Sequence, residues 1–284
     1  MATSPDRLWA AADAVERAGA RAWLQALRSL KLGIDGAAVA AELAAGNTAS
    51  ALALLRPADQ VRLLYAMLQQ MGPLRALGWA STTQAVGVPT FVALATYASQ
   101  RPEVLTLIRD HALARTADLA GVAGTTARQV LAEGLRTGTN PRVTARLLVD
   151  SIGLHPRQAA AVGRVRARLL AGGASNVEAQ VGRYAERQLR TRAETIARTE
   201  SMQALNEGNR LALAALQADG KLPPGEWERE WVTAPDERVC PECEPLDGAR
   251  APIGGMFPTG ALGPPLHPRC RCVERLVVVD QAAG

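Results

Sequence analysis

The sequence predicts a mainly α-helical protein in which multi-helix N-terminal and central regions and a long helix lead into a small α+β C-terminal module stabilised by zinc. Of its 284 residues, 48% are hydrophobic but only 4% are aromatic. The apolar content is therefore mostly Ala, Leu and Val, and small or straight-chain side chains favour helices. Residues 223–284 differ in character, because they hold all four cysteines and a strand-like alternation. A chain of this length can bury a sizeable core.

Residues 1–120 are predicted to form short and medium helices joined by tight loops. The Ser-Pro-Asp sequence at residues 4–6 is a strong helix start, with Ser at the N-cap and Pro at the first helical position. This helix should stop at Gly33. The uncharged stretch 76–100 is long enough to cross a bilayer, but Pro89 and several polar residues interrupt it. A buried helix pair is therefore preferred to a membrane segment.

Residues 121–222 form the second predicted helical region. The pair Thr125-Thr126 predicts a helix start. The short helices and turns that follow could be mistaken for a helix-turn-helix reader of DNA, and packing is the preferred interpretation. A long helix is predicted from about Asn176 to Ala218, with a break near residues 190–192. Glycines and prolines at residues 220–225 close the helical part and place a domain boundary there.

The charge of the chain is mildly basic, with a formal net charge of +5 and a pI near 9.4. Nearly all of the positive charge is arginine, since Lys31 and Lys221 are the only lysines. Arginine makes bidentate contacts with phosphates and carboxylates, which suggests DNA or an acidic partner. The alternative is that a GC-rich genome encodes Arg in place of Lys, so that the arginines reflect codon composition alone. The absence of a dense basic run favours this alternative. The candidate phosphate contacts are Arg164, Arg166, Arg168, Arg183, Arg187, Arg190 and Arg192.

The C-terminal module, residues 223–284, is predicted to contain β-structure. Trp227 and Trp231 lie in a run that alternates in a strand-like way, which places both rings on one face of a strand. The Asp-Gly pair at residues 247–248 is typical of a hairpin turn, because it tolerates positive φ. Residues 273–279 form a short β-branched run. Loops should join these strands.

Five candidate metal ligands lie in this module. Cys240-Pro-Glu-Cys243 is a C-x2-C knuckle, and His267-Pro-Arg-Cys270-Arg-Cys272 follows 24 residues after its second cysteine. Tetrahedral zinc needs four N or S donors, commonly given as two close pairs separated by a loop. Cys270 and Cys272 would point to opposite faces of a regular strand. His267 and Cys270 have the spacing of the first knuckle, and which of the five donors is spare stays open.

Three other interpretations of the cysteines are possible. Two disulfides need an oxidising compartment, and the N-terminus lacks the pattern of a secretory signal. Unpaired buried thiols are a second alternative. A redox-active C-x2-C lacks its βαβ context. Zinc is preferred, and with three or four thiolates the site is closed and structural rather than catalytic. Such an ion contributes on the order of 10 kcal/mol to folding.

At this point the residues resemble the phage head-morphogenesis (Mu protein F-like) minor capsid family. The specific part is Pro-Pro-Leu-His-Pro-Arg-Cys-Arg-Cys at residues 264–272, and the Arg-Thr-Glu helix at 198–200 precedes it. The resemblance covers roughly residues 193–275, with a vaguer helical likeness from about Thr125. It implies that Arg198 and Glu200 dock the long helix onto the module, unless they belong to an ordinary solvated helix face. The structural motif residues are Arg198, Thr199, Glu200, Trp231, Asp236, Arg238, Asp247 and Gly248.

The resemblance implies a minor capsid protein of a tailed bacteriophage or prophage. It would be a low-copy virion component that acts in head assembly near the portal, with portal, capsid and scaffold proteins as partners and packaged DNA as a further contact. It would have no membrane partner, and it would occupy the host cytoplasm during assembly. The first 120 residues match no family pattern, so their role stays open.

Two alternatives differ in class from a structural virion protein. The first is a nucleic-acid-binding zinc protein that uses the arginines named above. The second, less favoured, is a toxin-related enzyme, because relatives of this module are fused to toxin domains. Against an enzyme, the only histidines are His111, His155 and His267, and no nucleophile elbow, phosphate-binding Gly-rich loop or His-Glu-x-x-His motif occurs. We therefore expect a protein that is not an enzyme.

Overall fold

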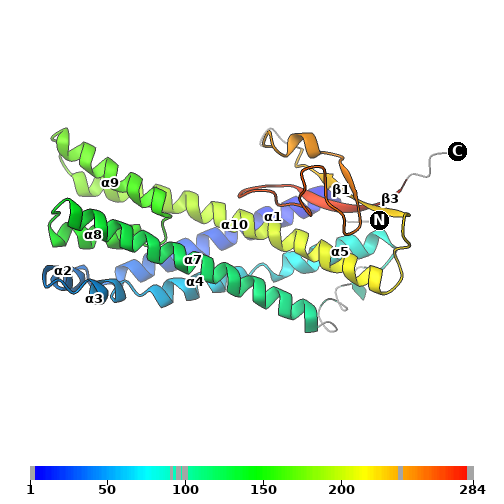
Figure 1. Cartoon of the computed structure of the whole chain (residues 1–284), viewed down its shortest axis with the longest axis horizontal. Coiled ribbons are helices and arrows are strands. Elements are labelled where there is room, and N and C mark those ends of the chain that lie inside the picture. The colour runs from blue at the N-terminus through cyan, green and yellow to red at the C-terminus, as the bar shows by residue number, and fades with distance from the viewer. Residues whose placement is uncertain (1–3, 90–91, 94–96, 98–101, 236–238, 280–284) are drawn as a thin grey trace. The chain divides into compact units, whose positions relative to one another are not determined.

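The computed structural model describes residues 4–89, 92–93, 97, 102–235 and 239–279, and it is mainly helical (Figure 1). The helices are α1 (Pro5–Leu32), α2 (Gly36–Ala44), α3 (Thr48–Ala53), α4 (Pro57–Gln69), α5 (Gly72–Ala85), α7 (Pro102–Arg136), α8 (Pro141–Ser151), α9 (Pro156–Ala171) and α10 (Val177–Ala218). This confirms the helical fold class predicted from composition. Within the described residues, no helix combines the length and the apolar content that a bilayer span requires.

Helix α1 has the bounds that the sequence predicts, whereas α7 does not begin where expected. It runs unbroken through Thr125 and Thr126. The hydroxyl of buried Thr126 donates to the carbonyl of Val122, one turn earlier, at 2.9 Å and lies 3.1 Å from the carbonyl of Leu154. A threonine bonded in this way sits inside a helix and packs against a neighbour. The predicted helix start is therefore wrong.

Helix α10 is continuous over 42 residues, so the predicted break near residues 190–192 is also wrong. Leu189, Ala193 and Ala197 recur every fourth residue along it and are fully buried. This spacing keeps one stripe of the helix facing the core on both sides of the expected break. The charged residues between them occupy the other faces, which is why the local sequence suggested an interruption.

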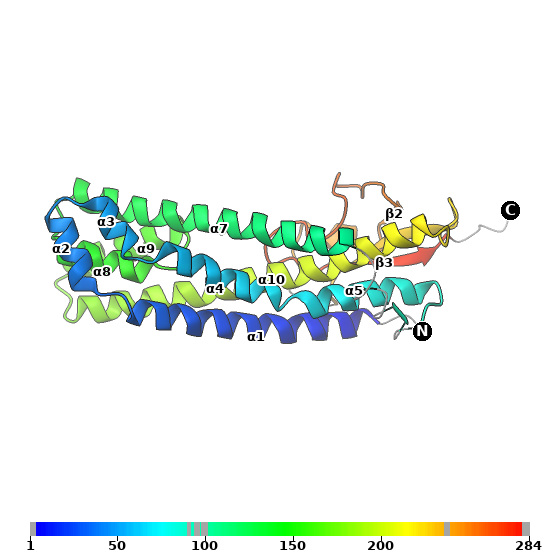
Figure 2. The same ribbon diagram turned by 90° about the horizontal axis from the view of Figure 1, so that it is seen from below.

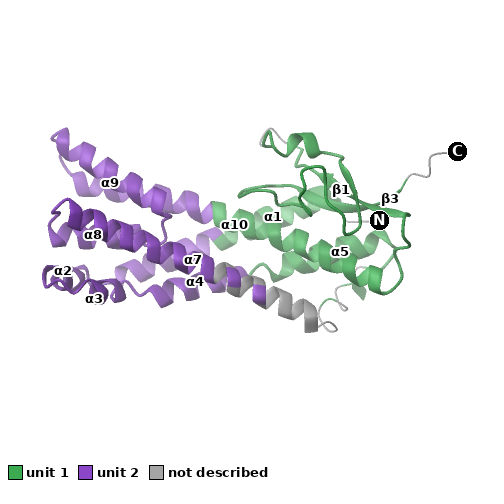
Figure 3. Cartoon of the chain, viewed as in Figure 1, with its two compact units in different colours: residues 1–19, 69–108, 195–284 green, residues 20–68, 109–194 purple. Residues whose placement is uncertain are grey.

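The chain divides into two compact units, each built from separated stretches (Figure 3). Unit 1 consists of residues 1–19, 69–108 and 195–284, and unit 2 of residues 20–68 and 109–194. Helices α1, α7 and α10 each contribute residues to both units. The division into consecutive segments 1–120, 121–222 and 223–284 stays a prediction.

In the described residues of unit 2, helices joined by short loops form the regular secondary structure. Helix α2 packs against α8. Helix α9 forms an antiparallel hairpin with the first turns of α10 (Figure 1). The amide of Gln158 donates to the carbonyl of Gln188 at 3.1 Å, and Arg166 pairs with Glu178 at 3.1 Å. These contacts lie near opposite ends of the hairpin and fix its register.

Unit 1 carries a three-stranded antiparallel sheet beside α5 and the second half of α10 (Figures 1 and 2). Its strands are β1 (Trp227–Val232), β2 (Arg250–Pro252) and β3 (Val273–Val278), in the order β2-β1-β3. The strands predicted around the two tryptophans and near the C-terminus are confirmed. The short 3-10 helix η1 (Glu244–Leu246) lies between β1 and β2.

Candidate metal centre

Two loops of unit 1 fold into similar tight turns. In the first, the backbone N–H of Cys243 donates to the carbonyl of Cys240 at 3.0 Å. In the second, the N–H of Cys270 donates to the carbonyl of His267 at 3.1 Å. Arg269, inside the second turn, has φ of 67°, a left-handed conformation that is uncommon for a residue with a side chain. Each turn brings residues i and i+3 to the same side of the backbone, as a metal knuckle requires.

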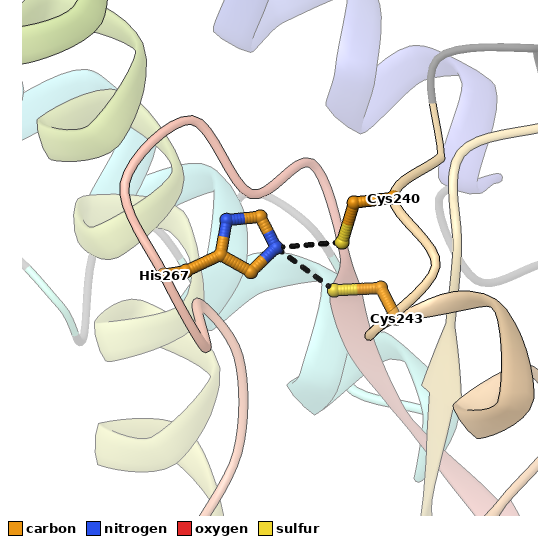
Figure 4. Close-up of side chains that lie close together, drawn as sticks. All are labelled: Cys240, Cys243 and His267. Carbon is orange, nitrogen blue, oxygen red and sulfur yellow. Dashed lines mark hydrogen bonds between the residues drawn. The ribbon is translucent and has the colours of Figure 1, made fainter.

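The two loops bring their side chains together (Figure 4). The Nε2 atom of His267 lies 2.8 Å from the Sγ atom of Cys240 and 3.2 Å from that of Cys243. The sulfur of Cys243 lies 3.8 Å from that of Cys270. Two groups of donor atoms, Cys240–Cys243–His267 and Cys243–Cys270–Cys272, each lie within 4.8 Å and share Cys243. All five candidate ligands therefore gather into one cluster that could bind a metal ion.

The orientation of His267 suits a metal ligand. Its Nδ1 atom lies 2.8 Å from the carbonyl oxygen of Pro268. Because a carbonyl oxygen only accepts, Nδ1 carries the proton and donates, and Nε2 presents its lone pair to the two sulfurs. A backbone carbonyl that fixes the tautomer in this way is the usual partner of a metal-binding imidazole.

The thiols of the cluster compete for protons. The hydrogen bond from Cys272 lowers the pKa of Cys270 to about 5. The same bond is the main cause that raises the pKa of Cys272, and burial is the second. In the other pair, burial and then the bond with Cys240 raise the pKa of Cys243. Burial acts to raise the pKa of Cys240, but hydrogen bonds from the side chain and backbone of Cys243 and from the backbone of Glu242 outweigh it and lower that pKa. One thiolate in each pair is stabilised at the expense of its neighbour, and a cation is what allows crowded thiols to ionise together.

The spacing of the sulfurs also fits coordination. All four cysteines are free thiols, and Cys243, Cys270 and Cys272 are each 2% exposed or less. A disulfide requires a sulfur–sulfur distance of about 2.05 Å. Two thiolates on one tetrahedral zinc, each about 2.3 Å from the ion, lie about 3.8 Å apart. The Cys243–Cys270 separation has this second value.

The motif residues next to the first knuckle join it to the sheet. The Asp247 carboxylate accepts from the backbone N–H of Thr233 at 2.8 Å and from its hydroxyl at 2.9 Å. Gly248, with φ of 75°, donates its N–H to the carbonyl of Trp231 at 2.9 Å. Trp231 is fully buried and meets Phe257 edge to face at 5.1 Å. The other two motif residues of this region, Asp236 and Arg238, lie outside the described residues.

The three residues of the Arg-Thr-Glu motif of α10 have different surroundings. Arg198 forms a two-pronged ion pair with Glu16 of α1, at 2.8 and 3.0 Å. The hydroxyl of Thr199 accepts from the backbone N–H of Arg269 at 3.0 Å. Glu200 is only 3% exposed. Thr199 thus bonds the loop that carries His267 and Cys270 directly.

Two asparagines that the sequence did not single out as site residues hold the outer edge of β3. Asn206 of α10 donates to the carbonyl of Cys272 and accepts from the N–H of Glu274, both at 3.1 Å. Asn209, one turn later, donates to the carbonyl of Glu274 at 3.0 Å. Since β3 is an edge strand, these side chains satisfy backbone groups that a sheet neighbour would otherwise bond. The only sequence signal was their shared helix face.

The candidate phosphate contacts lie in unit 2, whereas the cluster of Cys and His side chains lies in unit 1. Arg166 is engaged by Glu178, and burial lowers the pKa of Arg192 to about 10. The guanidinium of Arg187 lies 5.6 Å from the centre of the Tyr184 ring. The remaining candidates are exposed on α9 and on the first turns of α10, and they are Arg164, Arg168, Arg183, Arg187 and Arg190.

Comparison with known proteins gives one informative result. No curated protein and no solved structure matches the chain. The family model described as "Phage Mu protein F like protein" matches residues 125–275, which is more than half of the chain. The matched range contains all five cluster residues and the Arg-Thr-Glu motif of α10. The chain therefore belongs to the phage Mu protein F-like family.

Proposed function

We propose that this phage head morphogenesis protein is a low-copy structural component of the virion that contacts the portal and other capsid or scaffold proteins. Family membership over residues 125–275 supports a role in the phage head. The cluster of Cys and His side chains supports a structural rather than an enzymatic role, because four donors close a zinc site to water. The protein would reach the head from the host cytoplasm during assembly.

The observation that carries the structural role is the convergence of two loops on one metal-binding cluster. Thiolates with an imidazole suit zinc better than magnesium or calcium, which prefer oxygen ligands. We assign four ligand positions to Cys240, Cys243, His267 and Cys270. These residues form two pairs with i, i+3 spacing, Cys240 with Cys243 and His267 with Cys270. The sulfur of Cys270 lies 3.8 Å from that of Cys243. Cys272 is the spare donor.

Zinc would supply a fixed crosslink between the two loops, and the small core of the module explains why one is needed. This core consists of seven buried residues, three of which are cysteines: Trp231, Cys243, Leu246, Ala251, Phe257, Cys270 and Cys272. The same side chains thus form the ligand shell and much of the apolar interior. A structural zinc in such a module contributes on the order of 10 kcal/mol.

A gene replacement in the phage or prophage that encodes the protein tests the proposed role. We expect quantitative mass spectrometry of purified particles to find the protein at few copies relative to the major capsid protein, and crosslinking to join it to the portal. Deletion should reduce the yield of filled heads, and the wild-type gene in trans should restore it. Normal particles without the protein would overturn the proposal.

A second candidate activity is contact with packaged DNA. The arginine hairpin, defined as residues 156–192, contains eight arginines and two glutamates, a net charge of 8 − 2 = +6 against +5 for the whole chain. Both glutamates already have partners, since Glu178 pairs with Arg166 and Glu186 with Arg28. The hairpin therefore presents unneutralised arginine to its surroundings, which favours a phosphate backbone.

A further inference from the structure

The second metal-binding loop is held by helices whose residues lie far away in the sequence. We call residues 269–274, which include two of the cysteines, the ligand segment. At its start, the backbone N–H of Arg269 donates to the hydroxyl of Thr199 on α10 at 3.0 Å. Two residues later, the carbonyl of Arg271 accepts from the indole N–H of Trp9 on α1 at 2.9 Å. Both partners belong to unit 1 together with the ligand segment.

The far end of the ligand segment is held in the same way. The side-chain amide of Asn206 spans the carbonyl of Cys272 and the N–H of Glu274, at 3.1 Å each. Asn206 is fully buried, as is the contact it makes. The amide also donates to the carbonyl of Met202 on its own helix at 2.9 Å, which fixes its rotamer. The orientation of Asn206 is therefore supported by its own helix as well as by the ligand segment.

These bonds flank the ligand Cys270 and hold the spare donor Cys272. Cys270 lies between the residues bonded by Thr199 and Trp9, and Cys272 is itself bonded by Asn206. A metal ligand must be placed within a few tenths of an ångström of its position around the ion, and residues outside the ligand shell usually supply that precision. Arg269 has a left-handed backbone conformation, which costs free energy in a residue with a side chain. The bond from its N–H to Thr199 helps to stabilise this conformation.

We infer that Thr199, Asn206 and Trp9 are positioning residues that set the metal affinity of the cluster, so that the metal centre depends on helices α1 and α10 and is not confined to residues 223–284. This inference rests on the proposed metal site. Coupling between two events is reciprocal. Metal binding must therefore also strengthen the docking of the first turns of α1 and of the second half of α10 onto the ligand segment.

Two substitutions that each remove one hydrogen bond to the ligand segment test the inference in the full-length protein. Thr199→Val removes the acceptor for the Arg269 N–H, and Trp9→Phe removes the donor to Arg271. Zn²⁺ affinity is measured by competition with a chromogenic chelator. The loss of one hydrogen bond to the ligand segment should weaken zinc binding about fivefold for each variant.

Each variant has a matched control on the same helix. Thr191 of α10 bonds the carbonyl four residues earlier, as Thr199 does, so Thr191→Val controls for the loss of that bond. Trp23 of α1 is a buried tryptophan whose indole N–H has no acceptor among the described residues, so Trp23→Phe controls for the loss of the ring. Both controls should keep the wild-type affinity. Affinities of Thr199→Val and Trp9→Phe within twofold of their controls would overturn the inference.

Hydrogen exchange gives a readout that a merely structural role of these residues would not move. Addition of Zn²⁺ to the wild-type protein should slow amide exchange in residues 5–19 of α1 and 195–209 of α10, and Thr199→Val should reduce this effect. Unchanged exchange in both helices on zinc binding would contradict the coupling. A wild-type protein that binds no zinc would instead defeat the proposed metal site itself.

Discussion

Arg229 and Glu274 form an ion pair in which both side chains are almost completely buried. The Nη1 atom of Arg229 lies 2.9 Å from the Oε2 atom of Glu274, and the side chains are 4% and 1% exposed. The guanidinium also donates to the backbone carbonyls of Gly255 and Leu262 and lies 4.9 Å from the centre of the Phe257 ring. One arginine thus joins β1, β3 and the loop that leads to the second knuckle.

The two partners of this pair should differ in what their removal costs. Arg229→Met leaves a buried carboxylate without the donor shown for it, and we expect it to reduce the free energy of unfolding by about 3–5 kcal/mol. Glu274→Gln should cost less, because carbonyl oxygens still accept from Arg229. Burial also raises the pKa of Glu274 against the opposing effect of Arg210 and Arg229, so the charged form that the substitution removes is already disfavoured. Denaturant unfolding of the zinc-loaded variants measures both. Equal losses would contradict this assignment.

Two glycines permit the close approach of α5 and α10. A Cβ atom at Gly208 would lie 2.0 Å from the carbonyl oxygen of Arg75, and one at Gly78 would lie 2.1 Å from that of Leu205. We expect Gly208→Ala to destabilise the protein by about 1–3 kcal/mol, since neither backbone can yield cheaply. Thermal unfolding followed by circular dichroism measures the loss.

Gly182, on the same helix, is the control for this prediction. A Cβ atom there would meet nothing within 4 Å. Gly182→Ala should therefore raise stability by about 0.5–1 kcal/mol, because alanine loses less backbone entropy in a helix. If both alanine variants changed stability in the same direction, close packing would not be the reason for Gly208.

The sequence predicted the parts of the site that depend on local spacing. The four cysteines and His267 could be identified because metal ligands in small modules come in closely spaced pairs, and β1 because Trp227 and Trp231 alternate with charged residues. The family resemblance rested on the same local pattern and is confirmed by the family match. Neither inference needs to know which distant elements meet.

Contacts between distant elements could not be predicted in this way. Nothing in the sequence around Trp9 indicates that its indole bonds Arg271, 262 residues away. Thr126 resembled a helix cap because threonine serves both as a cap and as an internal back-bonded residue, and only its burial next to Leu154 decides between them. The role of Asn206 could not be predicted either, because it follows from the position of β3, to which its side chain bonds.

Stability should rise with pH through the titration of Lys31. Burial lowers the pKa of Lys31, against the raising effect of Asp150 and Glu186, and its ammonium donates to the carbonyl of Asp150 at 3.1 Å. Between this lowered pKa and the unfolded value of about 10.4, the unfolded chain binds more protons, so the native state gains stability as pH rises. The free energy of unfolding of the wild type should therefore rise relative to that of Lys31→Met as pH increases across this window. Denaturant unfolding of both proteins at several pH values measures the difference. A constant difference between the two would contradict it.

The arginine hairpin should bind DNA in a salt-dependent way. Replacing Arg183, Arg187 and Arg190 by Gln removes three exposed charges that share one face of α10. Each phosphate contact releases counterions, so we expect the triple variant to bind duplex DNA more weakly. The slope of the logarithm of the binding constant against the logarithm of the salt concentration should become about three less steep. Fluorescence anisotropy at several salt concentrations measures both quantities.

A matched variant separates local contact from net charge. Gln at three exposed arginines of α1 removes the same charge elsewhere, and these are Arg7, Arg17 and Arg21. This control should keep most of the DNA affinity and of the salt slope. Equal losses in the two triple variants would show that only the total charge matters, and an affinity indifferent to salt would remove the DNA-contact proposal.

The central claim is that one zinc ion joins the two loops of the C-terminal module, and elemental analysis of the purified full-length protein tests it most directly. We predict about one zinc per chain for the wild type and for Cys272→Ser, and its loss together with a lower melting temperature in Cys240→Ser, Cys243→Ser and Cys270→Ser. A folded protein that contains no metal, has disulfides at these cysteines and melts at the same temperature with and without a chelator would contradict the claim.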